Sequence, residues 1–147
     1  MKKAFTMIEL VFVIVILGIL SAVALPKFAK TKEMADISKG RSDVAAIRSS
    51  ILTEKQSQLI KGTNSFIPKL SNGTTLFTGD GNRTLMTYGM EEKTADGKWD
   101  AVDTNYMLYD FQVDSTPIRF TYNSTSGTFK CDRDDTTTGT ICRKLVD

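Results

Sequence analysis

Residues 5–25, which read FTMIELVFVIVILGILSAVAL, decide the fold of this chain because they are almost entirely apolar. A helix of this length measures about 30 Å, the thickness of the hydrocarbon core of a bilayer. A helix also satisfies every backbone hydrogen-bonding group within its own segment, as lipid requires. Lys2 and Lys3 precede the stretch and favour an N-terminus in the cytoplasm. The sequence therefore predicts a helix that crosses a membrane.

Glu9 is the one charged residue in that stretch. A carboxylate in an apolar membrane segment is costly without a partner, and such residues are by default candidates for a function. Phe5 lies one helical turn before Glu9, so an amine at Phe5 would be close if the chain began there. Within one molecule this pairing competes with the amides of the first turn, whereas between staggered copies it would set the register of assembly. A signal anchor that tolerates Glu9 near the interface is the simpler alternative.

The residues AFTMIEL at positions 4–10, followed by the apolar run, resemble the prepilin leader and cleavage/methylation motif of type IV pilins and type II secretion pseudopilins. The resemblance covers residues 1–55. It implies that prepilin peptidase cuts between Ala4 and Phe5 and methylates the new Phe5 amine, which Glu9 of a neighbouring subunit then neutralises. Gly18 and Pro26 match positions where helices of this family loosen or bend. The family usually has Gly where this chain has Ala4, whose small side chain should still fit the peptidase.

After the apolar run, the sequence predicts that the helix continues in amphipathic form. Pro26 lacks an amide hydrogen and should bend the helix there. Ile37, Val44 and Ile51 then recur at intervals of seven, with three further apolar residues beside this stripe: Ala45, Ile47 and Leu52. Gly62 is a stop signal. We therefore expect one long helix from Phe5 to about Lys61. A parallel coiled coil is the alternative for its second half.

Residues 63–147 have the composition of short strands separated by turns. The expected strands are 84–88, 105–113, 118–123, 128–131 and 140–145, together with a small hairpin of 66–70 and 74–77 around Asn72-Gly73. The alternation of Ile118, Phe120 and Tyr122 with polar residues is typical of a half-buried strand. The predicted fold class is α+β and pilin-like, a long N-terminal helix packed on an antiparallel meander of three or four strands.

The expected domain organisation has four parts. Residues 1–4 form the leader, 5–25 the transmembrane or filament-core helix, 26–61 its amphipathic continuation, and 62–147 a β-rich head with a C-terminal disulfide loop. The two cysteines of the chain are Cys131 and Cys142. Beyond the membrane they would meet an oxidising compartment, where a pair of cysteines indicates a disulfide. A free thiol pair and a metal site are the alternatives.

Composition argues against several functions. The formal net charge is +2, with 19 basic and 17 acidic side chains, and removal of Lys2 and Lys3 would bring the side-chain sum to zero. No global basic field would then attract nucleic acid, and no nucleic-acid contact is predicted. Histidine is absent, which removes the commonest general base and transition-metal ligand. No phosphate loop, nucleophile elbow or catalytic carboxylate pair is visible, so we expect no enzyme.

Calcium in a head loop is the one cofactor alternative, and we otherwise expect none. Acidic residues gather at Asp80-Gly81-Asn82, in residues 96–103 and at 132–135. The resemblance to major pseudopilins, which carry calcium in a C-terminal loop, favours this site. No EF-hand pattern is present, and solvated loops are the preferred interpretation.

We therefore predict a structural subunit of a type IV pilus-like or type II secretion pseudopilus filament. The resemblance implies a single-pass inner-membrane protein with a periplasmic head, assembled into a periplasmic or extracellular filament. Its partners would be copies of itself, minor pilins or pseudopilins, prepilin peptidase, membrane lipid, and an inner-membrane assembly platform with its ATPase. The alternatives are a pilin of a DNA-uptake system and a secreted periplasmic binding module. In the latter, residues 1–24 would be a signal peptide cleaved after Ala22-Val23-Ala24.

Overall fold

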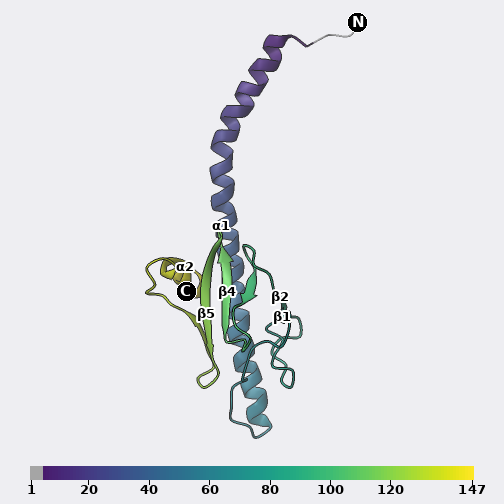
Figure 1. The fold of residues 1–147 in the computed structure, drawn as a ribbon, viewed down its shortest axis with the longest axis vertical. Helices are drawn as coiled ribbons and strands as arrows, with labels where there is room; N and C mark the ends of the chain where they lie inside the picture. Colours follow the sequence, from purple (N-terminus) through teal and green to yellow (C-terminus); the bar gives the residue numbers. More distant parts are fainter. Residues whose placement is uncertain (1–4) are drawn as a thin grey trace. The chain divides into compact units, whose positions relative to one another are not determined.

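The computed structural model describes residues 5–147, with residues 25 and 26 described by their backbone alone. A long helix, α1 (Met7–Ile60), is followed by six strands and a short helix, drawn in Figure 1. The strands are β1 (Thr75–Leu76), β2 (Met90–Glu91), β3 (Trp99–Ala101), β4 (Leu108–Val113), β5 (Thr116–Asn123) and β6 (Thr128–Cys131), and the last helix is α2 (Gly139–Val146). This arrangement confirms the predicted α+β, pilin-like class. The chain divides into two compact units, one ending at Ala35 and the other comprising Asp36–Asp147.

Local sequence signals define both ends of α1. At its start, the Glu9 N–H donates hydrogen bonds to the Thr6 carbonyl at 3.1 Å and the Thr6 hydroxyl at 3.3 Å. Thr6 and Glu9 have the Thr-x-x-Glu spacing of a capping box, so Thr6 caps the helix. At the end, Gly62 adopts φ 84°, and the Thr63 N–H donates to the Gln58 carbonyl at 2.9 Å. The left-handed conformation of Gly62 lets the N–H groups that follow the helix bond carbonyls of its last turn. The helix therefore ends where the sequence predicted.

One stripe of α1 is buried in the second unit. Its apolar members are Ile37, Val44, Ile47 and Ile51, all in the core. Ala45 and Leu52 were also expected on this stripe, but Ala45 is exposed and Leu52 is 56% exposed. Each follows a buried residue directly, which turns its side chain about 100° around the helix and away from the sheet. The expected apolar stripe is therefore correct in its centre and wrong at these two positions.

Strands β3, β4, β5 and β6 form one antiparallel sheet in that order, which confirms the predicted meander. Asp114 and Ser115 connect β4 to β5, and their φ values of 47° and 60° are those of a tight two-residue turn between twisted strands. In β5 the burial alternates, with Ile118, Phe120 and Tyr122 inside and the polar residues between them outside. Figure 1 shows β4 and β5 lying against the part of α1 that belongs to the same unit. The buried face of the sheet and the buried stripe of α1 share one core.

The expected hairpin around Asn72-Gly73 is wrong. Residues 66–70 form no strand, and β1 pairs instead with β2 in a separate two-stranded sheet. Pro68 has no N–H to contribute to a ladder, and Ile67 and Leu70 are both buried although an alternating strand would point them to opposite faces. The segment 84–88 is likewise no strand and contributes one isolated bridge, Gly79 with Thr84.

The expected last strand, residues 140–145, is also wrong, because this segment lies within helix α2. The buried residues of α2 are Gly139, Cys142 and Leu145, at intervals of three. Such spacing puts one face of a helix against the core, whereas a strand would bury every second residue. Strand β3 was not predicted from the sequence at all.

Candidate functional site

The first unit contains the apolar part of α1, and none of the large apolar side chains described there is buried. The most apolar stretch of 18 residues has a mean hydropathy of 2.9, and none of it is covered by the rest of the structure. The exposed apolar residues lie on every side of the helix and include Phe5, Met7, Ile8, Leu10, Val11, Phe12, Ile14, Leu17, Ile19, Leu20 and Val23. This helix is long and apolar enough to cross a membrane. Water is a poor environment for such a surface, so lipid or other helices must cover it.

Glu9 lies in the first turn of this apolar helix. Its backbone N–H is held by Thr6, but no group among residues 5–147 donates a hydrogen bond to its carboxylate. Phe5, the residue that the motif places at the new N-terminus, is 79% exposed. Ala4 and the bond between Ala4 and Phe5 lie outside the described residues. The processing site and the pairing of Glu9 between subunits therefore stay predictions.

The two expected bend positions lie within a single helix, since α1 runs through Gly18 and Pro26 without interruption. A methyl group at Gly18 would have no atom within 4 Å, so nothing in the chain requires a glycine there. The side chain of Pro26 lies outside the described part of the structure. Bending at these two positions stays a prediction.

In the second unit, a buried ion pair joins α1 to the loop that follows β1. The Arg83 guanidinium donates two hydrogen bonds to the Glu54 carboxylate, at 2.7 and 2.6 Å. It donates two more to the carbonyls of Ser65 and Phe66, both at 3.0 Å. Glu54 is 6% exposed, so these contacts compensate the loss of its hydration. Glu54 lies three residues after buried Ile51, which puts it on the buried stripe of α1.

A close approach between α1 and the sheet occurs at Gly40. A methyl group at this position would lie 2.4 Å from the Phe111 ring and 2.6 Å from the Leu145 side chain, closer than any real contact. One turn further along, the Asp43 carboxylate accepts a hydrogen bond from the Trp99 indole N–H at 3.1 Å. A missing side chain and a polar contact therefore bring this turn of the helix close to the sheet. Neither was noticed in the sequence, where Gly40 stands three residues after Ile37 on the buried stripe.

Cys131 at the end of β6 and Cys142 in α2 form the expected disulfide, with their Cα atoms 5.9 Å apart. Both residues are buried. Closing a loop of this length stabilises a fold by about 3 kcal/mol in the chain-entropy model. The Arg41 guanidinium adds two hydrogen bonds from α1 to the Lys144 carbonyl in α2, at 3.1 and 2.7 Å. Helix α2 is thus attached to both the sheet and α1.

The acidic loops use their carboxylates to hold their own turns. Asp135 accepts hydrogen bonds from the N–H groups of Thr137 and Thr138 and from the Thr138 hydroxyl, and these bonds hold the pKa of Asp135 below its ordinary value. Asp132 accepts one from the Asp134 N–H at 2.9 Å. Among residues 5–147, no three acidic, histidine or cysteine side chains lie close enough to hold one metal ion. Calcium can also bind backbone and amide carbonyls, so calcium in a head loop stays an untested alternative.

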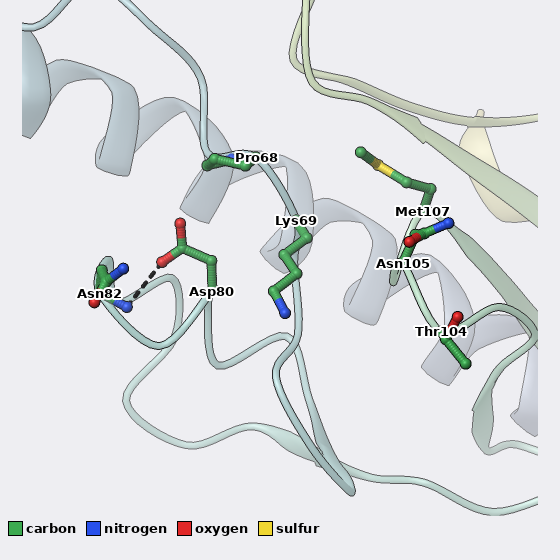
Figure 2. Close-up of a pocket in the computed structure, with 7 residues that line it drawn as sticks. All are labelled: Pro68, Lys69, Asp80, Asn82, Thr104, Asn105 and Met107. Carbon is green, nitrogen blue, oxygen red and sulfur yellow. Dashed lines mark hydrogen bonds between the residues drawn. The ribbon is translucent and has the colours of Figure 1, made fainter.

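A shallow cleft of about 520 Å³ lies on the surface of the head. Figure 2 shows Lys69 reaching between Asp80 on one side and Asn105 and Met107 on the other. Asp80 is occupied with its own turn, since its carboxylate accepts hydrogen bonds from the N–H groups of Asn82 and Arg83. The polar side chains that line the cleft can form hydrogen bonds with a molecule on the surface. None of the lining residues is a nucleophile paired with a base.

Two tyrosines buried beneath the sheet carry the clearest pKa shifts. The pKa of Tyr122 is raised to about 12, mainly by burial. The positive charge of Arg83 lowers this pKa and the negative charge of Glu54 raises it. Burial raises the pKa of Tyr109 as well, against a hydrogen bond from Ser71 that lowers it. The Tyr122 hydroxyl donates to the Ile67 carbonyl at 2.7 Å, and the Tyr109 hydroxyl to the Tyr106 carbonyl at 3.0 Å. These hydroxyls satisfy backbone groups within the core and stay protonated at neutral pH.

Comparison with known proteins finds one family motif at the N-terminus and three relatives that match part of the chain. Residues 1–25 match the family described as the prokaryotic N-terminal methylation motif. The chain is 36% identical over 72 residues to the type II secretion system core protein G of Dickeya chrysanthemi, which is 49% of this chain and 43% of that protein. It is 47% identical over 47 residues to the major component of the type IV narrow pilus of Thermus thermophilus, which is 32% of this chain and 40% of that protein.

A second core protein G, from Pectobacterium carotovorum, is 38% identical over 50 residues, or 34% of this chain and 32% of that protein. The chain therefore matches less than half the length of each of these relatives. No solved structure matches it. These comparisons confirm the prepilin-type motif at the N-terminus.

Proposed function

We propose that this protein is a structural subunit of a type IV pilus-like or type II secretion pseudopilus filament. The observation that carries the proposal is the N-terminal segment, which matches the methylation motif and exposes apolar side chains on every side of a helix. Its relatives are named as a core protein of a secretion system and a major component of a pilus, both parts of assemblies. No catalytic role is included in the proposal.

In the proposed cycle, prepilin peptidase removes Met1 to Ala4 on the cytoplasmic side and methylates the Phe5 amine. The apolar part of α1 first anchors the subunit in the inner membrane, with the head in the periplasm. An assembly platform with its ATPase then lifts subunits out of the lipid, and their apolar helices pack together in the filament core. Minor pilins or pseudopilins join the same filament. Lipid and neighbouring helices thus cover the same exposed surface in turn.

Glu9 has a defined task in this scheme. A carboxylate without a partner is costly in an apolar environment, and the first described turn of the helix provides no cation for it. If neighbouring helices are displaced along their axes by about one turn, the Phe5 amine of one subunit lies beside Glu9 of the next and neutralises it. Only correct register brings the two charges together, so misaligned subunits are disfavoured.

The decisive test is the N-terminus of the mature protein. We would extract the full-length protein from membranes and determine its intact mass and N-terminal sequence. A chain that begins at N-methylated Phe5 is the expected result. A soluble chain beginning at Leu25 would instead indicate a cleaved signal peptide and a periplasmic binding module, and an intact Met1 would indicate an unprocessed signal anchor. Either of these results would overturn the proposed assembly.

A second experiment separates the machines that such a filament could serve. Deletion of the gene should abolish either secretion of folded proteins or a surface pilus, according to the filament to which the subunit belongs. Loss of DNA uptake alone would assign the subunit to a competence pilus. The relatives include both a secretion protein and a pilus component, so the phenotype must decide.

A further inference from the structure

The dipeptide Asn72-Gly73 has an environment that favours chemistry within the chain itself. It lies in the loop between α1 and β1, outside every helix and strand, and the Asn72 side chain is exposed. A side-chain amide can be attacked by the backbone nitrogen of the next residue. The reaction needs a flexible neighbour, an available N–H and room for a five-membered ring. All three conditions can be checked in this loop.

The Gly73 nitrogen is available. No described residue accepts a hydrogen bond from its N–H, and φ at this glycine is 141°. A methyl group placed on Gly73 would find no atom within 4 Å, so the side of Gly73 where a Cβ would lie is open, whereas the Asn72 amide lies near Gly81. The absence of a side chain on Gly73 also removes the main steric barrier to ring closure.

A cation lies beside the group that is attacked. The Lys69 ammonium donates a hydrogen bond to the Asn72 side-chain carbonyl oxygen at 3.0 Å. Negative charge develops on this oxygen when a nitrogen adds to the amide carbon, and a charge-assisted hydrogen bond stabilises it. Figure 2 shows the Lys69 side chain extended into the surface cleft rather than packed in the core.

The loop is held in place on both sides of the dipeptide. On one side, the buried Ser71 hydroxyl accepts a hydrogen bond from the Phe77 N–H at 2.9 Å. On the other, the Thr74 carbonyl accepts one from the Glu92 N–H at 3.2 Å. The fold therefore presents Asn72 and Gly73 persistently to solvent while the residues around them stay fixed.

The other asparagines of the chain provide an internal comparison. Asn82 is followed by Arg83, whose N–H is bound to the Asp80 carboxylate at 2.7 Å. Asn105 is followed by Tyr106, whose N–H is bound to the Asp103 carbonyl at 3.2 Å. The remaining two asparagines, Asn64 and Asn123, precede serines. Asn72 alone combines a following glycine with an N–H that no described residue accepts.

We propose that Asn72 is a site of spontaneous deamidation promoted by Lys69. The Gly73 nitrogen loses its proton and forms a bond to the Asn72 side-chain carbon, the bond to the side-chain nitrogen breaks, and ammonia leaves. Water then opens the resulting succinimide to an aspartyl or isoaspartyl residue at position 72. The neutral hydrogen-bond partner of Lys69 becomes a carboxylate, and the net charge of the head falls by one. The charge on this face of the head thus changes with the age of the protein.

The test follows the full-length protein in detergent at neutral pH, in water enriched in heavy oxygen, by peptide mapping. We expect the peptide containing Asn72 to gain one dalton plus the heavy-oxygen increment, at a rate that exceeds that of the other asparagine peptides by an order of magnitude or more. Part of the product should be isoaspartyl. An unchanged Asn72 peptide, or a gain of equal rate at all five asparagines, would overturn the proposal.

Two variants and one denatured control isolate the role of the fold. Asn72→Gln should abolish the fast reaction, because the longer side chain closes a six-membered ring much more slowly. Lys69→Met keeps the apolar stem but removes the ammonium, and we expect a reaction several-fold slower in the folded protein but not in urea. A rate that Lys69→Met leaves unchanged in the folded protein, or a folded protein that reacts far more slowly than the unfolded chain, would contradict the proposed promotion.

Discussion

The two halves of helix α1 differ in the burial of their apolar side chains and in the hydrogen bonding of their carboxylates. Before residue 36, apolar side chains are exposed on every side, and the carboxylate of Glu9 has no hydrogen-bond donor among residues 5–147. After it, Ile47 and Ile51 are buried, and the carboxylate of Glu54 receives two hydrogen bonds from Arg83. Among residues 5–147, the carboxylate of the second half has its partner and that of the first half does not.

This difference teaches where the missing partners must be found. A helix that is apolar all round is stable only where lipid or other helices surround it. A carboxylate in such a helix needs a cation from the same surroundings. The buried stripe of the second half has its partners in the head. The unsatisfied half is therefore the part through which the proposed assembly takes place.

The largest effect is expected from Glu9→Ala, which removes the unsatisfied charge and leaves the apolar span intact. Membrane content of the protein should be unchanged, whereas filaments should be lost, as measured by immunoblotting of membranes and electron microscopy of sheared filaments. Ser21→Ala, which alters another exposed polar side chain of the same half, is the matched control and should assemble normally. Normal filaments from Glu9→Ala would contradict the proposed register.

Arg83→Met tests the satisfied carboxylate of the second half. It leaves Glu54 buried without a cation, and the free energy of unfolding should fall by about 3–5 kcal/mol in urea titrations. Lys98→Met breaks the exposed ion pair with Glu91, whose atoms lie 3.3 Å apart, and should cost about 1 kcal/mol or less. Adding Glu54→Leu to Arg83→Met should recover most of the loss. An equal loss of unfolding free energy in Arg83→Met and Lys98→Met would contradict the claim that burial makes the first ion pair the more costly one to break.

Two glycines on α1 sharpen the comparison of its halves. Gly40→Ala forces a methyl group against Phe111 and Leu145, and we expect a loss of about 1–3 kcal/mol in the stability of the head. Gly18→Ala meets no neighbour and should leave the unfolding midpoint of the head unchanged. Alanine at Gly40 also gains helix propensity, so the measured loss is a lower limit on the cost of the close packing. The measurement is urea unfolding followed by tryptophan fluorescence.

A smaller and more gradual effect is expected at alkaline pH. Because burial raises the pKa of Tyr122 to about 12, the folded protein retains a proton that the unfolded chain releases from about pH 10 upward. The contribution of Tyr122 to stability is therefore complete below about pH 10 and is lost as the pH rises towards 12. Tyr122→Phe should lower stability at neutral pH, through loss of the bond to Ile67, and flatten this decline. Parallel pH curves for the two proteins would refute the assignment.

Several elements of the fold could be predicted because their signals are local. The apolar run predicted a helix long enough to cross a membrane, and Gly62 marked the end of its amphipathic continuation. The alternation in 118–123 and the turn that follows predicted two strands correctly. Where the prediction failed, the local signal was ambiguous. Residues 140–145 contain apolar and β-branched residues suited to a strand, and only their spacing, read together with buried Gly139, indicates the helix that forms.

The remaining contacts could not be predicted because they join residues distant in the sequence. Arg83 lies 29 positions from Glu54, and nothing near either residue indicates the other. The partner of strand β1 was assigned to the preceding segment, although it follows at Met90–Glu91. Gly40 resembles any helical glycine until Phe111 and Leu145 are placed beside it. Long-range packing decides such contacts. The sequence around one residue does not identify the distant residue that it will contact.

The sequence by itself determined that this protein has an apolar helix with a single carboxylate, a long amphipathic continuation and a β-rich remainder. Hydrophobic periodicity and backbone hydrogen bonding act within a few residues, so they can be interpreted without coordinates. Only the tertiary structure decided that Glu54 is a buried ion-pair partner, that α2 is a helix tied to β6, and that Asn72 lies open beside Lys69. These properties depend on which distant groups become neighbours when the core closes.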